Sequence, residues 1–244
     1  MGRNKTRKRS RRSRRGGDAA GRICKMIADK QTYLFPLTES LRREWPDYRP
    51  HYFICHGHSV VTGAYAKTVV RPFDAYPHLW HRLLHEKFPT ALLNVIVTAI
   101  GGENSVSGAE RFRRDVLDRR PDLVTIDYGL NDRGVGLEKA RDAWRSMLDL
   151  CGAAKVPVIL LTPTLDAASV LNPKEGEILS AHAEQIRGLA SEYGVGLCDP
   201  HKAFQRYLQN GGDINELLSW INHPNRLGHE MIARELSGWF PMHG

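Results

Sequence analysis

The stretch YFICHGHSVVTG, residues 52–63, joins a run of apolar residues to a turn that carries a serine. The run Tyr52–Cys55 is short and continuous in apolar residues, as is typical of a strand covered on both faces of a parallel sheet. Gly57 and Gly63 suit a tight turn, and Ser59 lies between them. Such a serine can be an exposed nucleophile or an ordinary helix N-cap, and this stretch alone leaves both interpretations open.

Similar apolar runs recur along the chain and predict the architecture. Four more follow, at Leu92–Ala99, Leu123–Tyr128, Val156–Leu161 and Val195–Cys198. Between them lie segments with helical spacing of apolar residues, which cover 74–88, 107–119, 137–152, 174–193, 200–209 and 226–240. We expect Asp74 to cap the first of these helices. Alternation of strands with crossovers of this length predicts an α/β fold, a five-stranded parallel sheet with helices on both faces.

The N-terminus differs in composition from the rest. Residues 1–17 hold nine of the 35 Lys and Arg and none of the 27 Asp and Glu, so the remainder has a net charge near −1. We therefore expect a basic disordered tail over 1–20, a lead-in segment over 21–50 and one domain over 51–244. The tail could contact nucleic acid or another anionic surface, or it could be a solvated extension, and the composition leaves both open.

Composition argues against several protein classes. No apolar run approaches the roughly 18 residues that span a bilayer, and the basic N-terminus is not followed by the apolar segment of a secretory signal. A cytoplasmic location is therefore expected. The four cysteines are far apart and form no CxxC pair, which argues against a disulfide framework or a cysteine zinc site. Cys55 and Cys198 lie in strand-like runs and are expected to be buried.

Polar turns follow three successive strands, at Gly57–Ser59, Gly101–Gly102 and Gly129–Asp132. Ligands of such sheets bind beyond the carboxyl ends of the strands, so we expect these turns to meet at one edge. A fourth polar stretch, Asn222–Asn225, precedes the last predicted helix and contains His223. Ser59 is the candidate nucleophile, and His223 is the candidate base that such a hydroxyl needs.

Three groups are candidates for an oxyanion hole. The backbone N–H groups of Ser59 and Gly102 and the side-chain amide of Asn131 could each donate a hydrogen bond to the carbonyl oxygen that becomes negative during acyl transfer. Glycine at position 102 allows close approach of the backbone. Each of these residues is also common in ordinary turns, so the prediction depends on their occurring together.

The four stretches resemble the conserved blocks of the SGNH (GDSL-type) hydrolases, serine esterases and acyltransferases. The first block, G-D-S-x-x-x-G, is similar to residues 57–63, the second to 100–108, the G-x-N-D block to 129–132, and the final H-P-N and G-H to 223–225 and 228–229. The resemblance covers about residues 52 to 240. It implies a three-layer flavodoxin-like fold. It also implies hydrolysis of small acyl esters, such as acetyl groups on carbohydrates, through an acyl-enzyme without metal or cofactor.

The chain departs from the family pattern at two positions. His58 replaces the aspartate of the first block, and Trp220 stands where the family usually has its triad aspartate, three residues before the histidine. Asp213 and Glu216 are the nearest upstream candidates for an acid that orients His223. A backbone carbonyl could also hold the ring, which would make the site a Ser–His dyad.

Two alternatives remain open at this point, and a third is not favoured. The domain could be a catalytically impaired ligand-binding protein of the same fold, or an acyltransferase in which an alcohol replaces water. A metal site is the third, because four histidines lie in or beside the family blocks, namely His56, His58, His223 and His229. Their spacing is not distinctive, and no Cys or carboxylate ligand accompanies them, so no metal is predicted.

Overall fold

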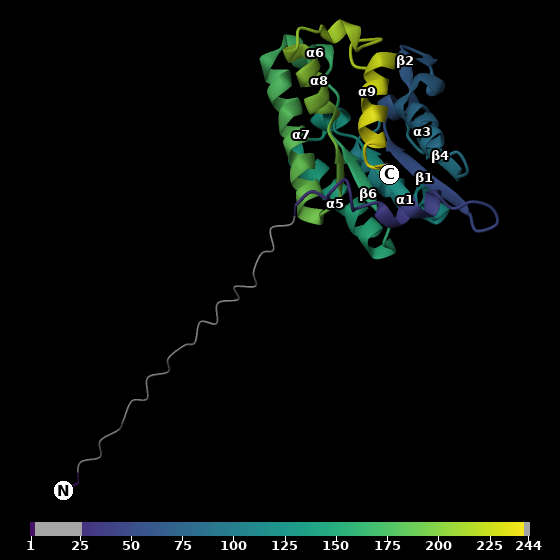
Figure 1. The fold of residues 1–244 in the computed structure, drawn as a ribbon. Coiled ribbons are helices and arrows are strands. Elements are labelled where there is room, and N and C mark those ends of the chain that lie inside the picture. Colours follow the sequence, from purple (N-terminus) through teal and green to yellow (C-terminus); the bar gives the residue numbers. More distant parts are fainter. Residues whose placement is uncertain (3–25, 242–244) are drawn as a thin grey trace.

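A five-stranded parallel sheet forms the centre of the molecule (Figure 1). The computed structural model describes residues 1–2 and 26–241. The strand order is β4-β1-β5-β6-β7, and all neighbours are parallel. The strands span Leu92–Val97 (β4), Pro50–Gly57 (β1), Leu123–Asp127 (β5), Val158–Leu161 (β6) and Gly196–Cys198 (β7). Each lies on one of the five predicted runs, so the predicted α/β architecture is confirmed.

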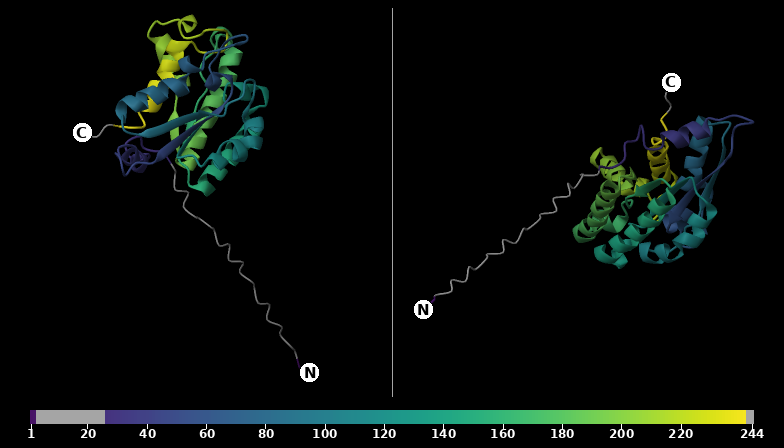
Figure 2. Two further views of the ribbon diagram at one scale, coloured as in Figure 1. Left: turned by 90° about the vertical axis from the view of Figure 1, so that its right-hand side faces the viewer. Right: turned by 90° about the horizontal axis from the view of Figure 1, so that it is seen from below.

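Helices cover both faces of the sheet, which gives three layers (Figure 2). One face carries α1 (Phe35–Leu41), α3 (Tyr76–Lys87), α8 (Pro200–Gln209) and α9 (Arg226–Ser237). The other carries α4 (Ser105–Asp115), α5 (Leu137–Ala154) and α7 (Pro173–Tyr193). In the left view of Figure 2, the blue α3 and yellow α9 lie on one side of the strands and the green α5 and α7 on the other.

The central strand β1 supplies both hydrophobic cores. Successive side chains of a strand point to opposite faces. Phe53 accordingly packs in the core under α3 and α9, where Trp80 is fully buried, and Ile54 packs in the core under α4 and α5 with Trp144. Burial of each such side chain contributes roughly 1.5–3 kcal/mol to stability. This alternation explains why the predicted strand reads as continuously apolar.

The described part of the lead-in packs at the amino-terminal edge of the sheet. The backbone N–H of Ala28 donates to Val195 O at 3.1 Å, and the Tyr33 hydroxyl accepts a 3.0 Å hydrogen bond from Val158 N–H. The helix α1 follows and buries Leu41. The tail predicted over 1–20 lies outside the described residues, apart from its first two.

The chain also contains short elements that the sequence analysis missed. A two-stranded antiparallel hairpin, β2 (Ala64–Ala66) and β3 (Val69–Val70), follows the first turn. The short helices are α2 (Ser59–Thr62) and α6 (Ala167–Leu171), with 3-10 turns η1 (Pro72–Asp74), η2 (Leu117–Arg119), η3 (Asn131–Gly134) and η4 (Ile214–Glu216). The α6 helix, β2 and the chain before α9 gather at the upper end of Figure 1, where the carboxyl ends of the strands lie.

The prediction that Asp74 caps a helix is wrong. The N-cap of α3 is Ala75, which makes no side-chain capping bond. Asp74 instead closes η1, and its carboxylate pairs with Arg226 at 2.9 Å. The local pattern of an acid before an apolar run was right, but Pro72 begins the separate turn η1, which Asp74 ends, and Pro77 lies in the first turn of α3.

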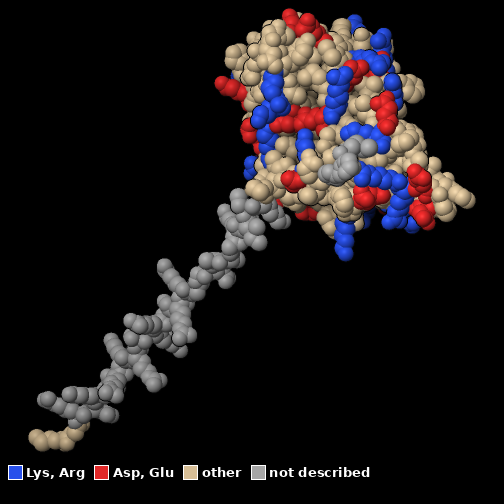
Figure 3. Space-filling view, viewed as in Figure 1, with Lys and Arg blue, Asp and Glu red and all other residues tan. Residues whose placement is uncertain are grey.

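Surface charge and hydropathy agree with the composition. On the face drawn in Figure 3, Lys and Arg are interspersed with Asp and Glu, as expected for a body of nearly zero net charge. Among the described residues, no helix combines the length and the apolar content needed to cross a bilayer. Cys55 and Cys198 are buried free thiols, as predicted, and burial raises the pKa of Cys55 to about 12.

Candidate active site

The structure brings the three polar turns together at the carboxyl edge of the sheet. β1 ends at Gly57, and the backbone N–H of Ile100, in the loop after β4, donates to Gly57 O at 3.1 Å. A Cβ placed on Gly101 would lie 4.0 Å from the Ser59 Cβ. The third turn joins this pair because the Asn131 side-chain amide donates to Glu103 O at 2.8 Å.

Ser59 and His223 meet at this edge. His223 Nε2 lies 3.0 Å from Ser59 Oγ, and both residues are partly exposed. Ser59 is the first residue of α2, a position at which helix geometry leaves the backbone N–H without an intrahelical acceptor. The arrangement provides a hydroxyl, an adjacent imidazole and a free backbone donor at one point.

A closed loop holds His223. Ser219 N–H donates to His223 O at 2.9 Å, and Ser219 Oγ donates to Tyr65 O at 2.7 Å, which ties the loop to the β2–β3 hairpin. Asn225 ends the loop as the N-cap of α9 and accepts from Gly228 N–H at 3.2 Å. These bonds explain why Asn225 and Gly228 occur in the last block, because both residues position the loop that carries the His223 imidazole.

The second ring nitrogen of His223 lacks a partner. Its Nδ1 is buried, and no atom of the described chain forms a hydrogen bond with it. Burial lowers the pKa of His223, and the nearby His58 lowers that pKa further. The ring is therefore neutral over a wider pH range than a free histidine, which leaves Nε2 able to accept a proton.

Neither candidate orienting acid reaches His223. Asp213 caps η4 and accepts from Asn215 N–H at 2.8 Å. Glu216 accepts from the Tyr207 hydroxyl at 2.8 Å and from Asp213 N–H at 3.0 Å. These two carboxylates form a reciprocal capping box, so the hypothesis that either one orients His223 is not supported. Trp220, at the position of the family aspartate, is 42% exposed.

The two oxyanion candidates other than Ser59 lie on neighbouring loops. Gly102 has a φ of +82°, and a Cβ there would meet nothing within 4 Å, so the backbone conformation rather than space requires glycine. One N–H of the Asn131 amide binds Glu103 O, and the amide has a second N–H. Asp132, fully buried, fixes this turn by accepting from Ser105 N–H at 2.8 Å and from Trp144 Nε1–H at 2.7 Å.

A buried network that the sequence analysis missed supports the oxyanion loop. Arg111 makes hydrogen bonds to both carboxylate oxygens of Glu103. The Tyr128 hydroxyl lies 3.3 Å from Arg111 and 3.0 Å from His56 Nε2. Gly108 allows this packing, because a Cβ there would lie 2.3 Å from the Tyr128 ring. The second block thus contains a glycine required by close approach.

His58 lies beside the nucleophile and accepts a capping hydrogen bond from Val60 N–H at 3.4 Å. Its Nδ1 is 3.4 Å from Ser59 Oγ, and its Nε2 is 3.5 Å from Asp127 Oδ1. The sequence analysis identified position 58 as a departure from the family but did not identify Asp127. The signal was available in principle, since Asp127 is the one charged residue of strand β5.

The other two histidines have structural partners. His56 bonds Thr98 Oγ1 at 2.9 Å, and burial lowers its pKa to about 4. His229 accepts from Tyr76 N–H at 3.3 Å, and burial lowers its pKa to about 3. Over the residues that the structure describes, no group of three or more His, Cys, Asp or Glu side chains is arranged to hold a metal ion.

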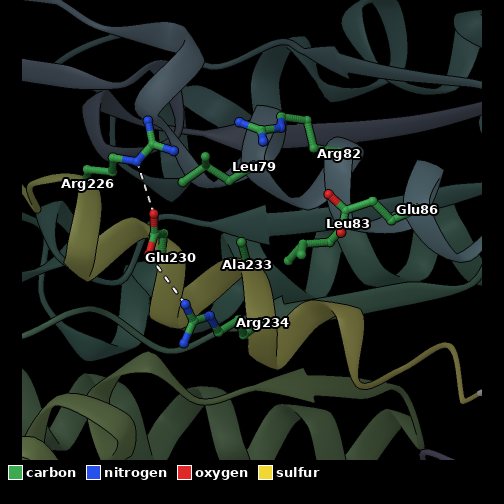
Figure 4. Close-up of a pocket in the computed structure, with 8 residues that line it drawn as sticks. All are labelled: Leu79, Arg82, Leu83, Glu86, Arg226, Glu230, Ala233 and Arg234. Atoms are coloured by element: carbon green, nitrogen blue, oxygen red, sulfur yellow. Dashed lines mark hydrogen bonds and ion pairs between the residues drawn. The ribbon is translucent and has the colours of Figure 1, made fainter.

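One hollow lies away from this site. A partly open pocket of about 140 Å³ is lined by side chains of α3 and α9, which Figure 4 shows. Its charged lining includes Glu230, which pairs with Arg226 at 3.0 Å and with Arg234 at 3.5 Å. Neither Ser59 nor His223 lines this pocket. The partly exposed edge around Ser59, and not this hollow, is the candidate substrate site.

Comparisons with known proteins agree with the geometry. A model of the GDSL-like lipase/acylhydrolase family matches residues 55–231, which contain all four polar stretches. A search of curated proteins found no match to the sequence.

Solved structures share the fold at low sequence identity. A mutant of an acetylxylan esterase from Geobacillus stearothermophilus is 21% identical, with a TM-score of 0.69 over 79% of this chain and 95% of that one. A two-domain esterase active on acetylated mannans is 18% identical, with a TM-score of 0.71 over 88% of this chain and 54% of that one. An α/β hydrolase from the metagenome of Lake Arreo in Spain is 23% identical, with a TM-score of 0.64 over 79% and 97%.

Proposed function

This chain belongs to the GDSL-like lipase/acylhydrolase family, a family of carboxylic ester hydrolases, and we propose that it hydrolyses esters of small acyl groups through an acyl-enzyme on Ser59. The observation that carries the proposal is the 3.0 Å contact between Ser59 Oγ and His223 Nε2. A serine hydroxyl is a weak nucleophile until a base accepts its proton. The contact is within the range for such a transfer.

The first half of the reaction acylates the serine. Ser59 Oγ attacks the ester carbonyl as His223 Nε2 takes the hydroxyl proton. Negative charge then develops on the carbonyl oxygen, and the backbone N–H groups of Ser59 and Gly102 and the amide of Asn131 would stabilise it. Each such donor contributes on the order of 10²–10³ to the rate, because it is held in place before the charge appears.

The second half releases the products. The tetrahedral intermediate collapses, and protonated His223 returns the proton to the leaving alcohol. Water then attacks the acyl-enzyme as Nε2 again accepts a proton, and Ser59 is regenerated with the free acid. The lowered pKa of His223 supports this role, because it favours the neutral ring that must accept a proton before Ser59 attacks the ester and before water attacks the acyl-enzyme.

Acetyl groups on carbohydrates are the substrate class that we propose. Two of the similar structures are described as an acetylxylan esterase and an esterase active on acetylated mannans. At this level of identity the likeness shows a shared fold, and the shared substrate is our proposal. An acceptor alcohol in place of water would make the same site an acyltransferase, and product analysis with and without added sugar alcohols separates the two.

Hydrolysis of p-nitrophenyl acetate by the wild type and Ser59→Ala tests the proposal. We expect Ser59→Ala to lose on the order of 10⁴ or more in kcat/KM. Thr62→Ala is the matched control, since Thr62 lies on the same short helix and its hydroxyl donates to the backbone carbonyl of Ser59 at 2.8 Å. Equal rates for the wild type and Ser59→Ala would exclude the mechanism. Binding of acetylated sugars without any hydrolysis would favour the ligand-binding alternative.

The location and the tail remain predictions. Deletion of residues 1–17, which hold nine basic residues, should leave ester hydrolysis unchanged. If the tail contacts nucleic acid or anionic lipid, the same deletion removes a salt-dependent binding that the full chain shows. The cytoplasmic location is a proposal from composition alone.

A further inference from the structure

We propose that His58, which lies beside the buried Asp127, is a second base for Ser59 and supplies an imidazole close to a carboxylate, which His223 lacks. This inference rests on the proposed ester hydrolysis at Ser59. It assigns a catalytic role to the residue that departs from the first family block and a positioning role to Asp127.

The contacts of His58 define its tautomer. Val60 N–H donates to His58 Nδ1 at 3.4 Å, so Nδ1 carries a lone pair and the ring proton of neutral His58 lies on Nε2. That Nε2 lies 3.5 Å from Asp127 Oδ1, a distance at which the two groups form no hydrogen bond but at which a protonated ring would be attracted to the carboxylate. Ser59 Oγ also lies 3.4 Å from Nδ1. Because Nδ1 has a single lone pair, taking up the hydroxyl proton would replace the long bond from Val60 N–H.

Burial argues that the pair of His58 and Asp127 is specific. Their exposed fractions are 1% and 5%. A carboxylate removed from water is costly unless a partner compensates its charge, and among the described residues His58 would become such a partner for Asp127 on accepting a proton. The sheet sets the distance, because Gly57 and Asp127 are register partners at the ends of β1 and β5.

The two imidazoles around Ser59 complement each other. His223 is closer to the hydroxyl, at 3.0 Å, but its buried Nδ1 has no partner in the described chain. His58 is slightly farther away and has a carboxylate behind it. A protonated His58 would gain an attraction to Asp127 that a protonated His223 does not find in any neighbouring acid.

The proposed step conserves atoms and charge. As the bond from Ser59 Oγ to the acyl carbon forms, the O–H bond breaks and its proton moves to His58 Nδ1. The ring becomes an imidazolium whose Nε2–H faces the Asp127 carboxylate. On collapse of the intermediate, the proton leaves His58 Nδ1 for the oxygen of the departing alcohol, and the bond from the acyl carbon to that oxygen breaks.

His58→Asn separates this role from helix capping. Asparagine is a favourable N-cap whose side-chain oxygen can accept from Val60 N–H, but it cannot take up a proton at neutral pH. Asp127→Asn is the second variant, because it keeps the size of the side chain and removes the charge. Both are made in the full chain and, separately, in a His223→Ala background.

The readouts are kcat and KM for p-nitrophenyl acetate and the rate of Ser59 labelling by a fluorophosphonate. In the wild-type background, we expect His58→Asn to lower kcat by about tenfold with KM unchanged, a part of the roughly 10²–10⁴ that a general base contributes. We expect the His223→Ala variant to be labelled slowly but measurably. Adding His58→Asn to this variant should reduce the labelling rate to that of Ser59→Ala, which has no nucleophile. Adding Asp127→Asn should reduce the rate by a similar amount. Thermal unfolding of each variant confirms that it is folded.

Several results would overturn the inference. A His58→Asn enzyme with wild-type kcat would exclude a catalytic role for this ring. A labelling rate of His223→Ala that is unchanged by adding His58→Asn would also exclude a catalytic role for His58. If His58→Asn fails to fold, a wild-type kcat for Asp127→Asn would exclude that role instead. If Ser59→Ala is inactive and the His58 and Asp127 variants are fully active, only this inference fails. If Ser59→Ala keeps full activity, the proposed function fails with it.

Discussion

The imidazole of His223 lies 3.0 Å from the hydroxyl of Ser59, although 164 residues separate them in the chain. Short backbone bonds make this contact: Asn225 N–H donates to Leu217 O at 2.8 Å, and Ala167 N–H donates to Ile221 O at 2.9 Å. The first closes the loop of His223 on itself, and the second fixes it to the start of α6. The contact between His223 and Ser59 is thus supported by the backbone of the loop and forms without a carboxylate at position 220.

Removing the side-chain amide of Asn131 tests the oxyanion hole. We expect Asn131→Ala to lower kcat by about 10²–10³, because a preorganised donor to the developing negative charge is lost. Kinetics of p-nitrophenyl acetate hydrolysis measure the change, and Asn94→Ala, in β4, is the control that should keep wild-type kcat. Since Asn131 also binds Glu103 O, unchanged thermal stability of the variant is needed to assign the loss to chemistry. A kcat within about twofold of the wild type would contradict the assignment.

Trp220→Asp tests the consequence of the missing acid. A carboxylate three residues before His223 would provide an acceptor for the buried Nδ1, which has none among the described residues. We expect kcat to rise by about tenfold, since an acid that holds the imidazole stabilises its protonated form. We also expect the acid limb of the pH profile of kcat/KM to move upward, because a carboxylate opposes the lowering of the His223 pKa by burial and by His58.

The control for this variant is Trp220→Asn, which offers an acceptor without a charge. In this variant the acid limb of the pH profile of kcat/KM should lie at the same pH as in the wild type, which is below the ordinary histidine pKa of 6.5. If Trp220→Asp and Trp220→Asn have the same profile, the loop does not direct position 220 toward Nδ1.

The sequence predicted the sheet and the meeting of its polar turns because both follow from local patterns. Each strand is a short apolar run, and the turns after three strands necessarily reach the same edge. The candidate residues Ser59 and His223 were found in the same way, since the family blocks carry them. The structure brings these two side chains together as expected.

The rest of the site was not predictable from local patterns. Asp127 and His58 are adjacent only because β5 pairs with β1 in one particular register, and a single sequence does not reveal that register. Asp213 and Glu216 were chosen for their proximity in sequence to His223. They cap η4 instead, because an acid three residues from another at a turn satisfies the backbone locally.

Gly108→Ala tests the packing under the oxyanion loop. A Cβ at this position would lie 2.3 Å from the Tyr128 ring, so overpacking should lower the free energy of unfolding by about 1–3 kcal/mol. Gly152→Ala, inside α5, is the matched control, since its Cβ would meet nothing within 4 Å and alanine favours the helix by about 0.5–1 kcal/mol. Urea denaturation should therefore move the two midpoints in opposite directions. Equal shifts would show that helix propensity, and not contact with Tyr128, decides the result.

Buried histidines should make the protein less stable in acid. Burial lowers the pKa of His56 from 6.5 to about 4, so between these values the unfolded chain binds a proton that the folded chain does not. Above pH 6.5 His56 leaves the free energy of unfolding unchanged with pH. As the pH falls below 6.5 the free energy of unfolding decreases, by up to about 1.4 kcal/mol per pH unit for this one group. Urea denaturation between pH 4 and 8 measures the slope, and His56→Gln should reduce it by about one proton. Above pH 7 the wild type and the variant should differ by a constant, because neither state of His56 is then charged. A variant whose slope in acid equals that of the wild type would show that His56 is not a source of the pH dependence.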